Sequence, residues 1–273
     1  MKTREYGTSG PNVVLLHGGP GVAGYMAGVA RGLADSFRVL EPWQRRSSGE
    51  PLTVAQHIAD LDQLILSRCG SSTPALVGSS WGAMLGLAYA AAHPTSVRAV
   101  VLIGCGTFDS AARRRFRATV RERMGDALRA RVDNLADEVP TADERLRVMM
   151  DLLLPLYSHD LETTDLEVEV VDARAFEETW TDMILQQEAG VYPAAFTAIQ
   201  TPVLMLHGVE DPHPGTMIRA SLAPHVPQLE YREWPRCGHY PWLERAIRAD
   251  FFSVLRAWLG GVFGTEGAVG EPK

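Results

Sequence analysis

Short, nearly continuous apolar runs recur along the chain, and segments with helical periodicity separate them. Continuous rather than alternating hydrophobicity is typical of strands that are covered on both faces, as in parallel sheets. Their alternation with helices implies right-handed βαβ units and a mostly parallel α/β sheet. The pattern predicts strands at Asn12–His17, Phe37–Glu41, Ala75–Ser79, Arg98–Ile103, Pro202–His207 and Gln228–Trp234.

Helical patterns fill the intervals between these strands. A capping box at residues 53–56 predicts the start of a helix that Gly70 ends. Residues 81–93 are apolar almost all round, as expected for a central helix packed under others. An amphipathic pattern over residues 247–258 predicts a last helix that ends at the glycine pair 260–261.

Residues 107–195 interrupt this alternation. Helical patterns and charge dominate there, and a second capping box at residues 141–144 starts one of the helices. We therefore expect a helical insertion between two strands of one core, which consists of residues 1–106 and 196–263. The segment 264–273 has too little apolar surface to order itself, and we expect a flexible tail.

The composition excludes a disordered or fibrous chain, because 46% of the 273 residues are hydrophobic and 22% are charged. The 26 Lys and Arg against 33 Asp and Glu give a net charge of −7, which argues against a nucleic-acid partner. Segment 71–97 carries no charged residue. Its unbroken apolar part, residues 83–92, is too short to span a bilayer, so we expect no membrane partner.

The cysteine pattern favours a reducing compartment. Cys69, Cys105 and Cys237 are odd in number and widely scattered, so they predict no disulfide framework. The first residues are basic, but no apolar segment follows them, so a secretory signal is not expected. We therefore expect a cytoplasmic protein.

The motif with the clearest chemical meaning is GSSWG at residues 78–82, which fits G-x-S-x-G. It follows a predicted strand directly and precedes a predicted helix. In that context a sharp turn pushes the middle residue, Ser80, out above the sheet as a nucleophile. The helix N-terminus adds a partial positive charge. The alternative is a Ser- and Gly-rich turn without chemistry.

A serine hydroxyl needs a base to take its proton. His239 lies in a loop after the last predicted strand, and Asp211 lies just past the strand before it. With Ser80 they form the chain order Ser, Asp, His of a nucleophile-elbow hydrolase. Glu210 and Asp109 are rivals for the acid, since each also follows a strand; we prefer Asp211.

The oxyanion of an acyl-transfer reaction needs two converging N–H donors. One is the backbone N–H of Trp81, the residue after the expected nucleophile. The other should come from the HGGPG segment at residues 17–21, where Pro20 has no N–H and Gly19 is our choice. His17 opens this segment, and we expect it to brace the loop through hydrogen bonds.

The same glycines support a competing hypothesis. Gly19, Gly21 and Gly24 fit G-x-G-x-x-G after a strand, and Glu41 ends the next strand. This arrangement is also that of an NAD(P)-binding oxidoreductase. Such a function would leave the serine, aspartate and histidine contexts unexplained.

Four motifs together resemble the α/β-hydrolase superfamily, and more narrowly its proline iminopeptidase branch of serine hydrolases. The resemblance implies an α/β-hydrolase fold, a helical cap made by the insertion, the catalytic and oxyanion residues assigned above, and no cofactor. Its segments are HGGPG at 17–21, GSSWG at 78–82, HGVED at 207–211 and CGHYPW at 237–242.

The resemblance leaves the substrate open. Members of that branch bind a free amine through cap carboxylates, but acidic residues on exposed helices are usually only solvated. An aminopeptidase, a carboxylesterase and a lactonase acting on a small ester or amide are equally compatible, and so is a non-catalytic ligand-binding protein. The oligomeric state also stays open. The available cap carboxylates are Glu177, Glu178, Asp182 and Glu188.

The cap offers few other signals. Tyr157, Trp180 and Tyr240 are candidates for walls of a substrate pocket. The arginine-rich segment 113–123 is interpreted as a solvated helix. Eight histidines are spread singly, and His207 and His213 have no second ligand at suitable spacing, so no metal site is expected. The methionine pair 149–150 is apolar and flexible enough to line a lid.

Overall fold

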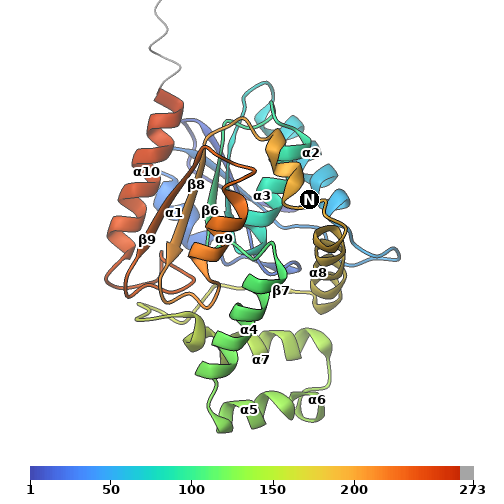
Figure 1. The fold of residues 1–273 in the computed structure, drawn as a ribbon. Coiled ribbons are helices and arrows are strands. Elements are labelled where there is room, and N and C mark those ends of the chain that lie inside the picture. Colours follow the sequence, from blue (N-terminus) through green and yellow to red (C-terminus); the bar gives the residue numbers. More distant parts are fainter. Residues whose placement is uncertain (265–273) are drawn as a thin grey trace, which may run out of the picture.

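A seven-stranded sheet forms the centre of the structure, a computed structural model that describes residues 1–264 (Figure 1). The six predicted strands are confirmed to within a residue or two, and they run parallel to one another. An additional N-terminal strand, β1 (Thr3–Tyr6), pairs antiparallel with β4 (Arg38–Pro42) at the edge. The spatial order is β1 (Thr3–Tyr6), β4 (Arg38–Pro42), β2 (Asn12–Leu16), β5 (Ala75–Ser79), β6 (Ala99–Ile103), β8 (Val203–Gly208) and β9 (Leu229–Trp234).

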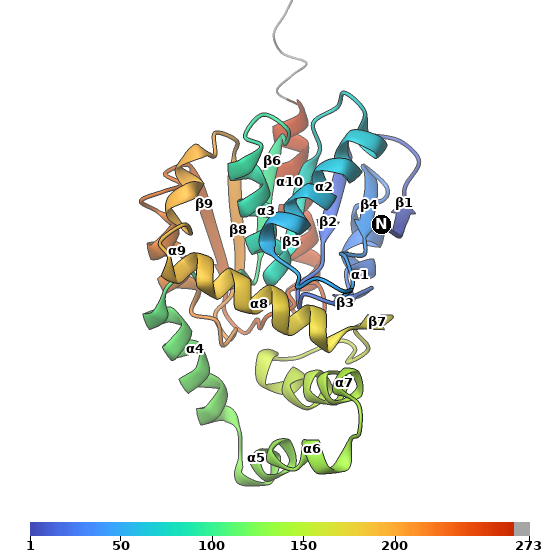
Figure 2. The same cartoon turned by 90° about the vertical axis from the view of Figure 1, so that its right-hand side faces the viewer.

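Helices cover both faces of this sheet, as Figure 2 shows. On one face lie α2 (Val54–Cys69), α3 (Trp81–Ala92) and α9 (Gly215–Leu222), which share a buried apolar cluster with alternate strand residues. On the other lie α1 (Ala27–Leu33) and α10 (Arg248–Gly264). Because both faces are buried, the strands need apolar side chains on each side, which explains their continuous hydrophobicity.

The last helix is longer than predicted. The expected stop at residues 260–261 is wrong, because α10 continues to Gly264. Val262 and Phe263 pack against the core, and the Phe263 ring lies 6.1 Å from that of Phe37. This apolar contact outweighs the poor helix propensity of two glycines, about 1 kcal/mol each. Of the expected flexible tail, residues 264–273, Gly264 belongs to α10, and residues 265–273 lie outside the described residues.

The chain leaves the sheet after β6 and returns to it at β8, and between them it forms several helices. We call helices α4 to α8 the cap; Figure 2 shows them beside the carboxyl ends of the parallel strands. One short strand of this region, which the sequence pattern did not predict, pairs with β3 (Val22–Ala23). The elements are α4 (Ser110–Arg123), α5 (Asp126–Asp133), α6 (Leu135–Glu138), α7 (Ala142–Leu153), η1 (Leu154–Tyr157), β7 (Val170–Val171), α8 (Ala173–Glu188) and η2 (Ala194–Ala198).

Helix α8 fastens the cap to the core. Its carboxylates Glu178 and Asp182 accept hydrogen bonds from the backbone N–H groups of Leu52 (3.0 Å) and Val54 (2.7 Å). These two donors lie just before and at the start of α2, where N–H groups lack intrahelical partners. The predicted capping box at Thr53 is confirmed at the same place. No helix within residues 1–264 is long and apolar enough to cross a membrane.

Candidate active site

The turn between β5 and α3 exposes Ser80 above the sheet. Ser80 has φ 54° and ψ −116°, a backbone conformation that residues other than glycine rarely adopt. Its glycine neighbours permit the close packing. A Cβ atom on Gly78 would lie 2.2 Å from the Gly82 carbonyl oxygen, and one on Gly82 would lie 2.0 Å from that of Leu16. The five-residue motif therefore has the strained strand-to-helix geometry that its sequence predicted.

Asp211 and His239 meet at the same edge of the sheet. Asp211 follows β8, His239 follows β9, and the two are 5% and 3% exposed. The His239 Nδ1 lies 2.6 Å from the Asp211 Oδ2. Burial alone would raise the pKa of Asp211, but the neighbouring imidazoles of His239, His213 and His207 hold that pKa well below its usual range. The carboxylate is therefore ionised and able to orient the His239 ring.

The two rival acids have other partners. Glu210 is 44% exposed and lies 3.8 Å from Arg123. Asp109 caps the N-terminus of α4, where its side chain accepts a hydrogen bond from the Ala112 N–H at 2.8 Å. Asp211, in contrast, faces the imidazole of His239 directly.

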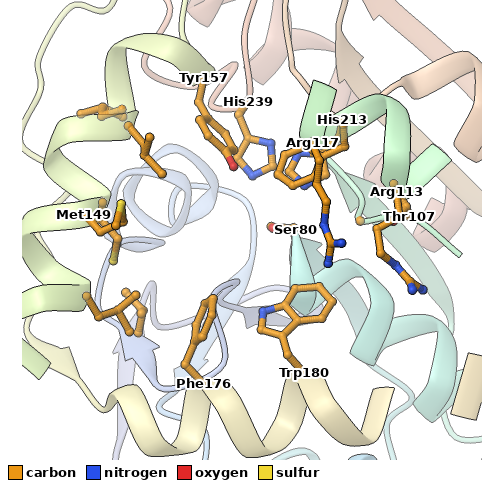
Figure 3. A pocket seen from close by; sticks show the side chains of 18 of the residues that line it. Ser80, Thr107, Arg113, Arg117, Met149, Tyr157, Phe176, Trp180, His213 and His239 are labelled. Carbon is orange, nitrogen blue, oxygen red and sulfur yellow. The ribbon is translucent and has the colours of Figure 1, made fainter. Parts of the chain in front are cut away.

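Ser80 and His239 line one cavity of about 460 Å³ between the core and the cap. Figure 3 shows both side chains facing this space. Within residues 1–264 the Ser80 hydroxyl and the His239 ring make no direct hydrogen bond, although they share the cavity. The cap reaches the loop that carries the histidine, because the His239 N–H donates to the Tyr157 carbonyl at 2.7 Å.

Two backbone N–H groups are available beside Ser80. The N–H of Trp81 belongs to the first residue of α3, where helix N–H groups have no intrahelical acceptor. Gly19 lines the cavity with φ +45°. Its neighbour Gly18 approaches so closely that an added Cβ would lie 2.7 Å from the Cβ of Ser80. These positions are those expected for an oxyanion hole.

His17 braces this glycine loop, as the sequence predicted. Its Nε2 accepts from the Gln44 N–H at 3.0 Å, and its Nδ1 lies 3.0 Å from the Gly18 carbonyl oxygen. The Gln44 side chain donates in turn to the His17 carbonyl and accepts from the Trp81 indole, each at 2.8 Å. Burial lowers the pKa of His17 to about 4, so the ring is neutral at pH 7.

A second imidazole shares the Asp211 carboxylate. The His213 Nδ1 lies 2.9 Å from the Asp211 Oδ1, and the His213 ring stacks on that of His239 with centroids 4.9 Å apart. The expectation that His213 has no second ligand nearby is wrong, because the candidate ligand atoms of Asp211, His213 and His239 lie within 4.8 Å of one another. The tight Asp-Pro-His-Pro turn brings His213 back onto the carboxylate. Its spacing of two residues from Asp211 was the available signal.

The cavity walls include the three expected residues, Tyr157, Trp180 and Tyr240. Segment 113–123 is exposed or half-buried throughout, as the interpretation of a solvated helix predicted, and two of its residues, Arg113 and the exposed Arg117, also line the cavity. Positions four apart lie on one face of a helix, and this face of α4 turns toward Ser80. The cap carboxylates that could bind an amine are absent from the described lining.

The segment proposed for a dinucleotide has a different structure. Gly19 to Gly24 lead into the short strand β3, and α1 begins only at Ala27, so these glycines do not form a direct strand-to-helix turn. Glu41 is fully buried and accepts hydrogen bonds from Arg4 and from the Tyr6 hydroxyl. The acidic residue expected to bind a ribose is therefore engaged within the protein.

Comparisons with known proteins agree with this architecture. The family described as alpha/beta hydrolase fold matches residues 11–246. A cis-3-alkyl-4-alkyloxetan-2-one decarboxylase of Shewanella oneidensis is 29% identical over 107 residues, which cover 36% of this chain and 34% of that protein. The chain therefore matches about a third of the length of this curated relative.

Solved structures resemble the chain over nearly its whole length. MenH from S. aureus has a TM-score of 0.68 at 16% identity, covering 95% of this chain and 98% of that one. An enol-lactonase from Burkholderia xenovorans LB400 has a TM-score of 0.62 at 20% identity (94% and 95%). A proline iminopeptidase from Mycobacterium smegmatis has a TM-score of 0.61 at 20% identity (95% and 94%). At these identities the likeness is one of fold.

Proposed function

The chain belongs to the α/β-hydrolase family, and from this premise we propose that it is a serine hydrolase that cleaves a small ester or lactone through an acyl-enzyme. The observation that carries the proposal is the 2.6 Å contact between Asp211 and His239 at the edge of the cavity that the strained Ser80 lines. Serine is activated in this way when a base and an orienting acid stand in line with it.

The proposed reaction has two steps. The Ser80 Oγ attacks the substrate carbonyl while the His239 Nε2 takes its proton, and the Gly19 and Trp81 N–H groups stabilise the oxyanion. Collapse of this intermediate breaks the bond to the leaving alcohol, which receives the proton from His239. Water then attacks the acyl-enzyme with His239 as the base, and the products are a carboxylic acid and free Ser80. In a lactone the alcohol and the acid stay in one molecule.

Several observations favour an ester or lactone over a peptide with a free amino terminus. A free amine is a cation and needs an anionic partner, yet no Asp or Glu is part of the described cavity lining. Glu178 and Asp182 hold backbone groups of the core, and Glu177 and Glu188 are exposed. An enol-lactonase and an esterase are among the proteins of similar fold.

The proposal is tested by a substrate panel measured on the whole protein. The panel contains 4-nitrophenyl esters of short acids, a set of γ- and δ-lactones, and proline β-naphthylamide. We expect hydrolysis of at least one ester or lactone and loss of that activity in Ser80→Ala. Cleavage of the prolyl amide alone would refute the ester assignment. No turnover of any substrate, with ligand-dependent thermal stabilisation intact, would favour a non-catalytic binding protein.

A further inference from the structure

The cavity beside Ser80 has two walls of different chemistry. One wall comes from α7 and η1 and is aliphatic. The other comes from α4 and carries two arginines, with polar neighbours Thr107 and Gln187. Figure 3 shows Met149 and Arg113 on opposite sides of Ser80 in that view. The aliphatic wall is made by Leu146, Met149, Met150, Leu153 and Leu154.

The charge of this lining has one sign. Among the described residues, the lining includes Arg113 and Arg117 but no Asp or Glu, although the chain as a whole carries a charge of −7. The cavity lining is therefore locally basic, although the protein as a whole is acidic. Such a local field attracts anionic small molecules and not cationic ones.

The two arginines differ in their partners. Arg113 is engaged, since its guanidinium donates to the Gln187 side chain of α8. Arg117 makes no side-chain hydrogen bond or ion pair within residues 1–264, and it extends into the cavity above Trp180 in Figure 3. A guanidinium has a planar set of donors that fits a carboxylate with two parallel hydrogen bonds. The five donors of Arg117 are available to a ligand there.

We propose that the substrate carries a carboxylate that Arg117 binds, and an apolar group that occupies the aliphatic wall on the other side of the scissile carbonyl. This inference rests on the proposed function and names its substrate class, a carboxylated ester or lactone. The planar guanidinium of Arg117, which has no partner within residues 1–264, fits a carboxylate with two parallel hydrogen bonds. Gln187 lies on the same side, where its side chain accepts from Arg113 and donates to the Thr107 carbonyl at 3.0 Å.

The kinetic test compares pairs of esters that differ in one charge. In the first pair, mono-4-nitrophenyl adipate carries a carboxylate on the acyl side and its methyl ester is neutral. In the second pair, 4-carboxyphenyl hexanoate carries a carboxylate on the leaving group and its methyl ester is neutral. We expect kcat/KM of the anionic member of at least one pair to be about 2- to 5-fold higher, because Arg117 is exposed and ion pairs at exposed side chains are screened by solvent. Arg117→Gln should bring that ratio close to one.

Arg121→Gln is the matched control. Arg121 lies one turn further along α4, is exposed and is not part of the cavity lining. The ratio and both rates should stay at the wild-type values in this variant. Equal rates for the anionic and neutral members of both pairs would overturn the inference, as would an unchanged ratio in Arg117→Gln.

A binding measurement separates this inference from the proposed function. In Ser80→Ala, calorimetric titration with hexanoate, hexanamide and inorganic phosphate probes the anion site without turnover. We expect hexanoate to bind more tightly than the other two and to lose this advantage in Ser80→Ala/Arg117→Gln. Equal binding of hexanoate and hexanamide, or tighter binding of phosphate, would refute the carboxylate site even if the enzyme hydrolyses esters. Carboxylate-selective binding without hydrolysis would refute only the catalytic proposal.

Discussion

Replacing Asp211 by Asn removes the charge that faces His239 and keeps the size of the side chain. At the observed 2.6 Å separation and an effective dielectric constant of about 20, an imidazolium and a carboxylate attract each other by about 6 kcal/mol. The net loss is smaller, because both charges are already removed from water and Asn keeps a neutral hydrogen bond. We expect kcat/KM to fall about 1,000- to 10,000-fold, which is about 4–5 kcal/mol of transition-state stabilisation.

The assay is hydrolysis of the best ester found in the panel, with circular dichroism and thermal unfolding to show that the variant is folded. Asp109→Asn and Glu210→Gln are the controls, since Asp109 caps α4 and Glu210 is exposed. Both should hydrolyse the ester at close to the wild-type rate. A folded Asp211→Asn protein that keeps more than about a tenth of the wild-type kcat/KM would refute the role of this carboxylate. If only Asp109→Asn lost activity, Asp109 and not Asp211 would be the acid that supports His239.

His213, the buried imidazoles of His17 and His57, and two glycines of contrasting surroundings, Gly82 and Gly260, can each be tested by one measurement. His213→Gln removes the second imidazole from the Asp211 carboxylate, whose pKa then rises, so activity should fall more at pH 5 than at pH 8 in a pH–rate profile; a uniform loss would contradict this. Burial lowers the pKa of His17 and His57 in the folded protein to about 4. As the pH falls, the unfolded chain therefore binds a proton at each imidazole before the folded chain does. Stability should be full above about pH 6.5 and decline toward pH 4, by about 3 kcal/mol for each group; equal urea midpoints at pH 7.5 and 4.5 would be inconsistent with this. Gly82→Ala should lower the free energy of unfolding by about 3 kcal/mol through its backbone clash, whereas Gly260→Ala, with open space around its Cβ, should stabilise by about 1 kcal/mol; similar thermal midpoints would refute the packing argument.

Much of the fold could be predicted because local signals and tertiary packing agree. The apolar runs at Asn12–Leu16 and Ala75–Ser79 are strands with both faces buried, and the capping box at Thr53 starts α2. The strand β1 was not predicted, because its residues Thr3–Tyr6 are mostly polar and only intermediate in burial. It forms only because it pairs with the edge of β4, which is distant in sequence, and a local sequence pattern does not predict such a partner.

The candidate site was only partly predictable. The chain order of serine, aspartate and histidine identified the groups that meet at the sheet edge, since the parallel strands fix where their carboxyl ends lie. The face that Arg117 presents depends on how α4 packs over the core, and the sequence of a charged helix does not specify that rotation. His213 shares a carboxylate with His239 only because the turn after β8 folds back.

A fluorophosphonate probe reacts with serine nucleophiles and therefore tests whether Ser80 is a nucleophile that His239 activates. The protein is incubated with the probe, and the adduct is located by mass spectrometry of proteolytic fragments. We expect stoichiometric labelling of Ser80, no label in Ser80→Ala, and labelling slowed by orders of magnitude in a folded His239→Ala variant. A folded wild-type protein that stays unlabelled, or that carries the label on another residue, would contradict it.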